Sequence, residues 1–167
     1  MHTGLYVVMG VAASGKSTIG ARLACALDVP FIDGDDLHPR ANVERMAAGI
    51  PLTDDDRRPW LLAIAERLHD AKRAGEGLVV ACSALKRRYR DLLRTAGEAE
   101  VRFVYLKGNR TLLADRMTQR RGHFMPAALL ESQLAALEEP APDEDAWVCD
   151  IGATPDAIVA DLMARST

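Results

Sequence analysis

The chain has 167 residues, of which 49% are apolar and 27% charged, a balance typical of one globular domain with a sizeable core. The formal net charge of −3 disfavours a surface that coats nucleic acid, and no apolar run reaches the roughly 18 residues that a membrane-spanning helix needs. We therefore expect small-molecule ligands, with no nucleic acid and no membrane as partners. The N-terminus lacks the basic region and cleavage site of a signal peptide, so the expected location is cytoplasmic.

Five short apolar runs predict five buried strands, and segments with helical periodicity lie between them. The runs cover residues 5–10, 30–33, 78–82, 101–106 and 146–150. Apolar strands that alternate with helices are typical of a parallel sheet with helices on both faces. The pattern contains no internal repeat, so residues 1–167 are expected to form a single α/β domain.

The segment between the first predicted strand and the first helical pattern reads GVAASGKS, at residues 10–17, and matches G-x-x-x-x-G-K-[S/T]. In such a loop the glycines let the backbone wrap around phosphates, and N–H groups at the helix N-terminus point at the anion. We expect ATP as the nucleotide, with Lys16 at its β- and γ-phosphates and Ser17 on Mg²⁺. The other residues of this phosphate loop expected to bind the nucleotide are Gly10, Ala13, Ser14, Gly15 and Thr18.

Carboxylates crowd the end of the second predicted strand. The stretch FIDGDDLHP places Asp33, Asp35, Asp36 and His38 within six positions. Like charges this close cost stability unless a cation, a proton or a ligand offsets them. The third predicted strand ends in Cys82 and Ser83, without the Asp that many P-loop proteins use to hold magnesium, so we assign that role to Asp33. For Asp36, an N-cap of a helix starting near Leu37 and a substrate contact are both open.

Two predicted helices differ in the charge of their first turns. Leu61, Ile64, Ala65 and Leu68 have the spacing of an amphipathic helix over about residues 54–74, and a second pattern includes Leu85, Tyr89, Leu92 and Leu93. The helix dipole favours Asp54 to Asp56 but opposes Arg57, which suits an anionic substrate. Lys86, Arg87, Arg88 and Arg90 crowd the start of the second helix in the same unfavourable way. We expect an anionic ligand to offset one or two of them, favour Ser83 and Lys86 as its contacts, and expect the rest to be solvated.

Two further features are assigned no chemistry. The acidic segment EEPAPDED at residues 138–145 is expected to be a solvated loop. Cys25, Cys82 and Cys149 form no CxxC pair, and we expect all three to be small buried thiols.

Several segments together resemble the gluconokinases of the small P-loop kinase type, which are related in fold to shikimate and nucleoside monophosphate kinases. They are MGVAASGKSTIG, FIDGDDLHP, NVERMAAGIPLTDDDRRPWL, CSALKRRYRDLLR, VRFVYLKG and RRGHFMPAALLESQLAALEEP. Ala13 and Arg58 depart from the family's pattern. The resemblance implies a three-layer P-loop kinase fold, with a five-stranded parallel sheet in the order 2-3-1-4-5, helices on both faces and a mobile lid around residues 116–126.

The resemblance also implies an activity, the ATP-dependent phosphorylation of D-gluconate to 6-phospho-D-gluconate in gluconate catabolism, and a homodimer. Asp35 would be the general base. In the lid, Arg116 would lie against the adenine, and Arg120 or Arg121 would stabilise the transferring phosphoryl group. The further contacts to gluconate would come from His38, His123 and Gln133. A structural role for His38 at a helix start, and a solvated position for Gln133, are the alternatives.

Two other functions are open at this point. The first is a kinase for another polyhydroxy acid such as shikimate, which the CSALK segment disfavours because a shikimate kinase would show a glycine run there. The second is a nucleotide-binding gluconate sensor without turnover, which the intact Lys16, Ser17, Asp33 and Asp35 disfavour.

Overall fold

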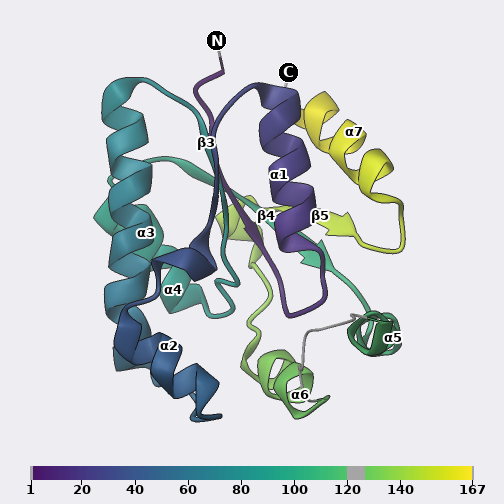
Figure 1. The fold of residues 1–167 in the computed structure, drawn as a ribbon. Helices are drawn as coiled ribbons and strands as arrows, with labels where there is room; N and C mark the ends of the chain where they lie inside the picture. Colours follow the sequence, from purple (N-terminus) through teal and green to yellow (C-terminus); the bar gives the residue numbers. More distant parts are fainter. Residues whose placement is uncertain (1, 120–126, 167) are drawn as a thin grey trace.

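The computed structural model describes residues 2–119 and 127–166 and shows helices on both sides of one sheet (Figure 1). The strands are β1 Leu5–Met9, β2 Phe31–Asp33, β3 Leu78–Ala81, β4 Val101–Lys107 and β5 Trp147–Asp150. All neighbouring strands pair in parallel, in the order β2-β3-β1-β4-β5. The predicted five-stranded parallel sheet and its strand order are confirmed.

The helices connect these strands. They are α1 Lys16–Leu27, α2 Arg40–Ala47, α3 Asp54–Ala74, α4 Arg87–Gly97, α5 Arg110–Gln119, α6 Ala127–Ala136 and α7 Pro155–Ser166, with short 3₁₀ helices η1 Gly34–Leu37 and η2 Pro142–Glu144. The helix predicted over residues 54–74 is α3. Across the described residues, the helices are too short or too polar to cross a bilayer.

Each face of the sheet has its own hydrophobic core. Val7 of β1 is fully buried against α3 and α4, where it joins Ile64 and Leu93. The next residue, Val8, points to the opposite face and packs in a cluster with Leu23 of α1 and Leu162 of α7. Because helices cover both faces, successive strand residues are all buried, and this explains why the strands read as continuous apolar runs.

Helix α3 begins with a capping box. The Thr53 hydroxyl accepts a hydrogen bond from the Asp56 N–H at 3.1 Å, and the Asp56 carboxylate accepts one from the Thr53 N–H at 2.9 Å. This bond lowers the pKa of Asp56. Asp54 and Asp55 add the negative charge that a first helical turn favours. The acidic run therefore marks the helix start, as the sequence predicted.

Two local expectations are wrong, and one of the two alternatives for Asp36 is excluded. Asp33 is the N-cap of η1 and Pro39 that of α2, so Asp36 caps neither helix, and its substrate contact stays a prediction. Cys25 is exposed, because it lies on the outer face of α1, whereas Cys82 and Cys149 are buried as expected. The acidic segment at residues 138–145 is not simply solvated, because the Glu144 side chain is 1% exposed and paired with arginines of α4.

Replacing the Thr53 cap tests how α3 is anchored. Thr53→Ala removes the hydroxyl that accepts the Asp56 N–H, and we expect it to lower the free energy of unfolding by about 1 kcal/mol. Urea unfolding followed by circular dichroism measures this change. Thr95→Ala, at an exposed position in α4, is the matched control and should shift it by no more than about 0.5 kcal/mol. Equal effects of the two substitutions would contradict the capping role.

Candidate active site

The phosphate loop joins β1 to α1 and depends on glycine at two positions. Gly10 and Gly15 have φ angles of +152° and +94°. A Cβ atom at Gly10 would lie 2.7 Å from the Ser14 Oγ and 3.1 Å from the Leu106 carbonyl oxygen, so no larger residue fits. Ala13 has φ +67°, the left-handed conformation that favours glycine. The loop backbone therefore takes the tight curve that phosphate binding requires.

Two side chains, one from the phosphate loop itself and one from α6, form hydrogen bonds with the backbone of the phosphate loop. The Lys16 ammonium donates to the Val11 carbonyl oxygen at 3.1 Å, so it folds back over the loop. The Gln133 Oε1 accepts a hydrogen bond from the Ala12 N–H at 2.6 Å. Ser14 is buried, and its hydroxyl has no hydrogen-bond partner among the described residues. Gln133 thus lies at the phosphate loop in this structure, and its contact with gluconate stays a prediction.

The end of β2 meets the first turn of α1. The Ser17 hydroxyl donates to the Asp33 Oδ2 at 2.8 Å, and the Asp33 Oδ1 accepts the Asp35 N–H at 3.0 Å. Loss of hydration in the site and the charge of Asp33 raise the pKa of Asp35, while Lys16 opposes the shift. The repulsion that the sequence indicated among these carboxylates is therefore the second cause of the raised pKa of Asp35, after burial.

Ser17 and Asp33 fit a magnesium ion. Their oxygen atoms, a hydroxyl and a carboxylate 2.8 Å apart, are donors of the kind that Mg²⁺ prefers. In phosphate sites this ion is typically bound through one or two protein oxygens, with phosphate and water completing its coordination. The donor set at the β2 end is of that type.

A pocket of about 220 Å³ lies beside the phosphate loop, and Arg116 of α5 contributes to its wall. Its lining also includes Ala13, Ser14, Gly15, Thr18, Ile19 and Ile151. The Arg116 guanidinium donates to the Ile151 carbonyl oxygen at 2.6 Å, which fixes its position. The structure therefore brings Arg116 together with the predicted nucleotide-binding residues, and its contact with adenine stays a prediction.

The loop from Ser83 to Lys86, which we call the acceptor loop, follows β3. The Gly10 N–H donates to the Ser83 carbonyl oxygen at 3.3 Å, so this loop lies against the phosphate loop. The Lys86 ammonium donates to Asp54 at 3.1 Å. Asp54 also accepts hydrogen bonds from Arg88, at 2.7 Å, and from the Tyr89 hydroxyl. These bonds, from Tyr89 first and then Lys86, lower the pKa of Asp54.

Arg57 completes this cationic cluster. Its guanidinium donates to the Leu52 carbonyl oxygen at 2.8 Å and to the Tyr89 hydroxyl at 3.2 Å. Three cations, Arg57, Lys86 and Arg88, thus lie around Asp54 and Tyr89. The sequence analysis placed Asp54 only at a helix start and Tyr89 only in an apolar pattern. It missed the contact between them, because the two residues are 35 positions apart and no local pattern joins them.

Arg88 is largely exposed, as expected, but two other cations at the start of α4 have carboxylate partners within the protein, where the sequence analysis expected solvent. Arg87 pairs with Asp143, and Arg90 is fully buried against Glu144. The helix dipole and mutual repulsion are therefore offset by carboxylates of the segment before β5. Lys86 and Arg88 share Asp54 beside the acceptor loop, and the Arg88 side chain stays 69% exposed.

His38 is held by an aromatic stack. Its ring lies 4.2 Å from the Trp60 ring, at an interplanar angle of 14°, and its Nδ1 lies 3.3 Å from the Asn42 Nδ2. The Trp60 indole N–H in turn donates to the Gly34 carbonyl oxygen at 2.7 Å. Burial first, and then the charge of Arg57, lower the pKa of His38 to about 4. His38 is therefore a neutral imidazole at neutral pH, and its contact with the polyol stays a prediction.

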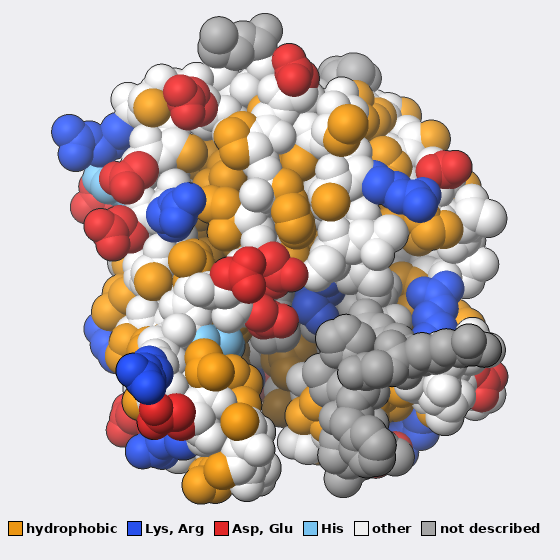
Figure 2. Space-filling model, viewed as in Figure 1, with side chains coloured by type: hydrophobic (Ala, Val, Ile, Leu, Met, Phe, Trp, Pro, Cys, Tyr) orange, Lys and Arg blue, Asp and Glu red, His pale blue; other side chains and the backbone are white. Residues whose placement is uncertain are grey.

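The whole site lies at one edge of the sheet. Figure 2 shows carboxylates, a cationic side chain and a histidine around a hollow on this face, between the positions of α2 and α6 in Figure 1. Arg120, Arg121 and His123 lie outside the described residues, so their predicted roles, like the lid, stay predictions.

A sheet of this order, with a phosphate loop after its central strand, defines the chain as a small P-loop kinase. A family model described as an AAA domain matches residues 5–140. A solved shikimate kinase from Aquifex aeolicus covers 96% of the chain, and 94% of its own, with a TM-score of 0.59, but at 14% identity it shows only the common fold.

Two nearer relatives identify the family. The thermoresistant gluconokinase of Escherichia coli K12 is 45% identical over 95% of this chain and 91% of its own length. The crystal structure of a gluconokinase from Sinorhizobium meliloti 1021 is 48% identical, covers 98% of this chain and 91% of its own, and has a TM-score of 0.88. The chain belongs to the gluconokinase family.

The environment of His38 predicts an unusual titration. Its folded-state pKa of about 4 lies below the ordinary 6.5, so protonation opposes folding. The stability contributed by the neutral ring is complete above pH 6.5 and is lost as the pH falls toward 4. NMR of the imidazole resonances should show the low pKa, and Arg57→Gln should raise it by removing a nearby positive charge. A wild-type pKa near 6.5 would contradict this description of the site.

Proposed function

We propose that this protein transfers the γ-phosphoryl group of ATP to D-gluconate, giving 6-phospho-D-gluconate and ADP. The observation that carries the proposal is the extent of the match to gluconokinases, 45–48% identity over nearly the whole chain. Shikimate kinase shares the fold at only 14% identity, which disfavours the shikimate alternative. The alternative of a gluconate sensor without turnover is also disfavoured. Ser17, Asp33 and Asp35 lie together as a candidate metal site and a candidate base, which a sensor would not need.

The donor side of the reaction is assigned to the phosphate loop. Its N–H groups and Lys16 would hold the phosphates, and Ser17 and Asp33 would hold a magnesium ion. When bound, magnesium neutralises part of the charge on the transferring group. Arg116 is assigned to the nucleotide, and Arg120 or Arg121 to the transferring phosphoryl group.

Asp35 is assigned to the acceptor hydroxyl. In the proposed step, the C6 oxygen of gluconate forms a bond to the γ-phosphorus while the bond from that phosphorus to the β,γ-bridging oxygen breaks. The hydroxyl proton passes to the Asp35 carboxylate, and ADP leaves. The raised pKa of Asp35 makes it a better base than an ordinary aspartate. A loose transition state demands little base strength, so holding the hydroxyl in line is the larger contribution.

The cationic cluster is assigned to the substrate carboxylate. Arg57 and Lys86 lie beside the acceptor loop, and Arg88 lies next to them. The single negative charge of Asp54 balances only part of the positive charge of these three residues. A carboxylate on the substrate would complete the balance, which favours an aldonic acid over a neutral sugar. Ser83, His38, Gln133 and His123 are the further proposed contacts. The homodimer and the cytoplasmic location stay predictions.

Acceptor specificity tests the proposed function. Purified protein with ATP and Mg²⁺ should release ADP with D-gluconate, and at least about 100-fold more slowly with shikimate, glucose or a nucleoside monophosphate. Phosphorus NMR should identify 6-phosphogluconate as the product. Turnover of another acceptor, with silence toward gluconate, would contradict the proposal while leaving the phosphate chemistry in place.

Asp35→Asn tests the proposed base. The amide keeps the shape of the side chain, but without the charge it holds the hydroxyl less firmly and cannot accept the proton, so kcat should fall by about 100-fold or more, with the KM for ATP nearly unchanged. Asp70→Asn, at an exposed position in α3, is the control and should leave kcat unaltered. An effect of Asp35→Asn confined to ATP binding would instead assign this residue to the metal ion.

A further inference from the structure

Arg90 of α4 is a fully buried cation that the proposed chemistry does not use. Its Nε donates to the Glu144 Oε1 at 2.7 Å, and its Nη2 donates to the Glu144 Oε2 at 3.1 Å. The Glu144 side chain is 1% exposed. Burial alone would raise the pKa of Glu144, but bonds from Arg90, the Ala141 N–H and Arg94 hold that pKa at about 2. Glu144 is therefore ionised across the ordinary pH range.

The same guanidinium binds two backbone carbonyl groups from distant segments. Its Nη1 donates to the Ala84 carbonyl oxygen at 2.8 Å, and its Nη2 to that of Glu138 at 2.9 Å. Ala84 is the centre of the acceptor loop. It is fully buried with φ +45°, a left-handed conformation that costs energy for alanine and needs support from its surroundings. Arg90 provides that support directly at the Ala84 carbonyl.

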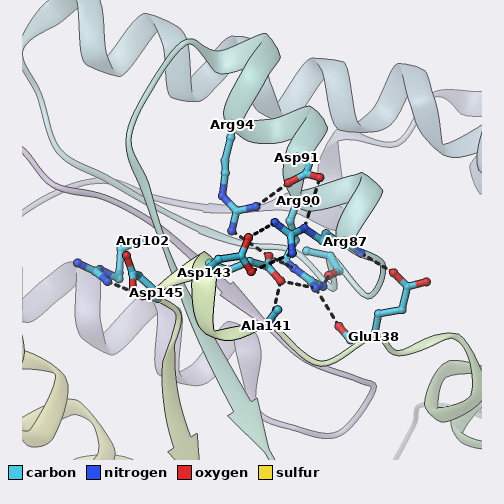
Figure 3. A network of polar contacts seen from close by, with 11 residues as sticks. Arg87, Arg90, Asp91, Arg94, Arg102, Glu138, Ala141, Asp143 and Asp145 are labelled. Carbon is cyan, nitrogen blue, oxygen red and sulfur yellow. Dashed lines mark hydrogen bonds and ion pairs between the residues drawn. The ribbon is translucent and has the colours of Figure 1, made fainter.

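Glu138, just beyond α6, clamps the loop from the other side. Its N–H donates to the Leu85 carbonyl oxygen at 2.7 Å. Its carboxylate accepts the Arg87 N–H at 2.9 Å, and so caps α4, whose own N-cap residue, Lys86, makes no side-chain cap bond. Figure 3 shows Arg90 at the centre of this network, between Arg94, Glu138 and the segment around Ala141 and Asp143. The acceptor loop is thus fixed on both sides of Ala84.

We propose that Arg90, held by Glu144, is a positioning residue that sets the acceptor loop, and with it Ser83 and Lys86, in the geometry that binds the phosphoryl acceptor. The inference rests on the proposed function, because that function places the acceptor at this loop. A buried ion pair contributes little net stability compared with apolar residues of the same volume. The fork of the guanidinium, which binds a carboxylate and two carbonyls at once, supplies geometry that an apolar group would not.

Arg90→Lys and Arg94→Lys form a matched pair of variants. Each keeps a positive charge next to Glu144, but only Arg90 also binds Ala84 and Glu138. One ammonium cannot replace the three-way fork, so Arg90→Lys should raise the KM for D-gluconate about tenfold and change the KM for ATP less than about twofold. Arg94→Lys should change both KM values less than about twofold. A KM does not depend on the fraction of active enzyme, so reduced folding alone would not produce this difference.

A purely structural role predicts a different result. Equal changes in the two KM values, or no change for gluconate in folded Arg90→Lys, would overturn the proposal. Should that variant fail to fold, Glu138→Ala tests the same loop from an exposed side chain. It should raise the KM for gluconate about threefold, and an unaltered value would overturn the proposal.

Hydrogen exchange separates this inference from the proposed function. If the wild-type protein phosphorylates a different acceptor, the proposed function is wrong, and the KM comparison of the two variants is then made with that acceptor. If the protein shows no turnover at all, hydrogen exchange of the backbone amides of residues 83–86 still reports on the order of the acceptor loop. It should rise about tenfold in Arg90→Lys and stay unchanged in Arg94→Lys, and equal exchange in the two variants would overturn the positioning role.

Discussion

The site depends on one constraint, which is that parallel strands all end at the same edge of their sheet. In the order β2-β3-β1, the segments that follow three neighbouring strands must meet there. The phosphate loop follows β1, the carboxylates follow β2 and the acceptor loop follows β3. The Ser17–Asp33 hydrogen bond joins the first two segments, and the Gly10–Ser83 bond joins the first and third. Residues far apart in the chain are thereby brought to one place.

Close packing at this edge fixes the positions further. A Cβ atom at Gly34 would lie 2.5 Å from the Ala81 carbonyl oxygen, so the start of η1 is pressed against the end of β3. Asp35 follows at once, with its N–H bound to Asp33. Burial first, and then repulsion from Asp33, raise the pKa of Asp35 there. A bound cation would offset this repulsion, which supports the magnesium ion that we propose at the β2 end.

The strands of the sheet and the phosphate loop were predictable from the sequence, because the signals for them lie within short continuous segments. A strand buried on both faces reads as a continuous apolar run, and the phosphate loop has a fixed spacing of glycine, lysine and serine, so the sheet and the loop appear directly in the pattern. The strand order came from the family resemblance. The start of α3 was also readable, because a capping box lies within four consecutive residues.

The network around Arg90 was not predictable in this way, because it depends on contacts between residues that are far apart in the sequence. Arg90 and Glu144 are 54 residues apart, and no local pattern marks an arginine as the buried partner of a particular glutamate. The position of Cys25 was missed for a different reason, because a residue between the buried Ala24 and Leu27 can still lie on the outer face of a helix. The 3₁₀ helix η1 was missed because four residues are too few to show a period.

The most direct test of the account is the magnesium dependence of Asp33→Asn. If Ser17 and Asp33 hold the ion that accompanies ATP, the variant should need about tenfold more Mg²⁺ for half-maximal turnover of D-gluconate, with its melting temperature little changed. Wild type and variant would be titrated with Mg²⁺ at saturating ATP and gluconate. Identical magnesium dependence in the two proteins would show that the ion is not bound at the β2 end, and would contradict the convergence of strand ends as the basis of this site.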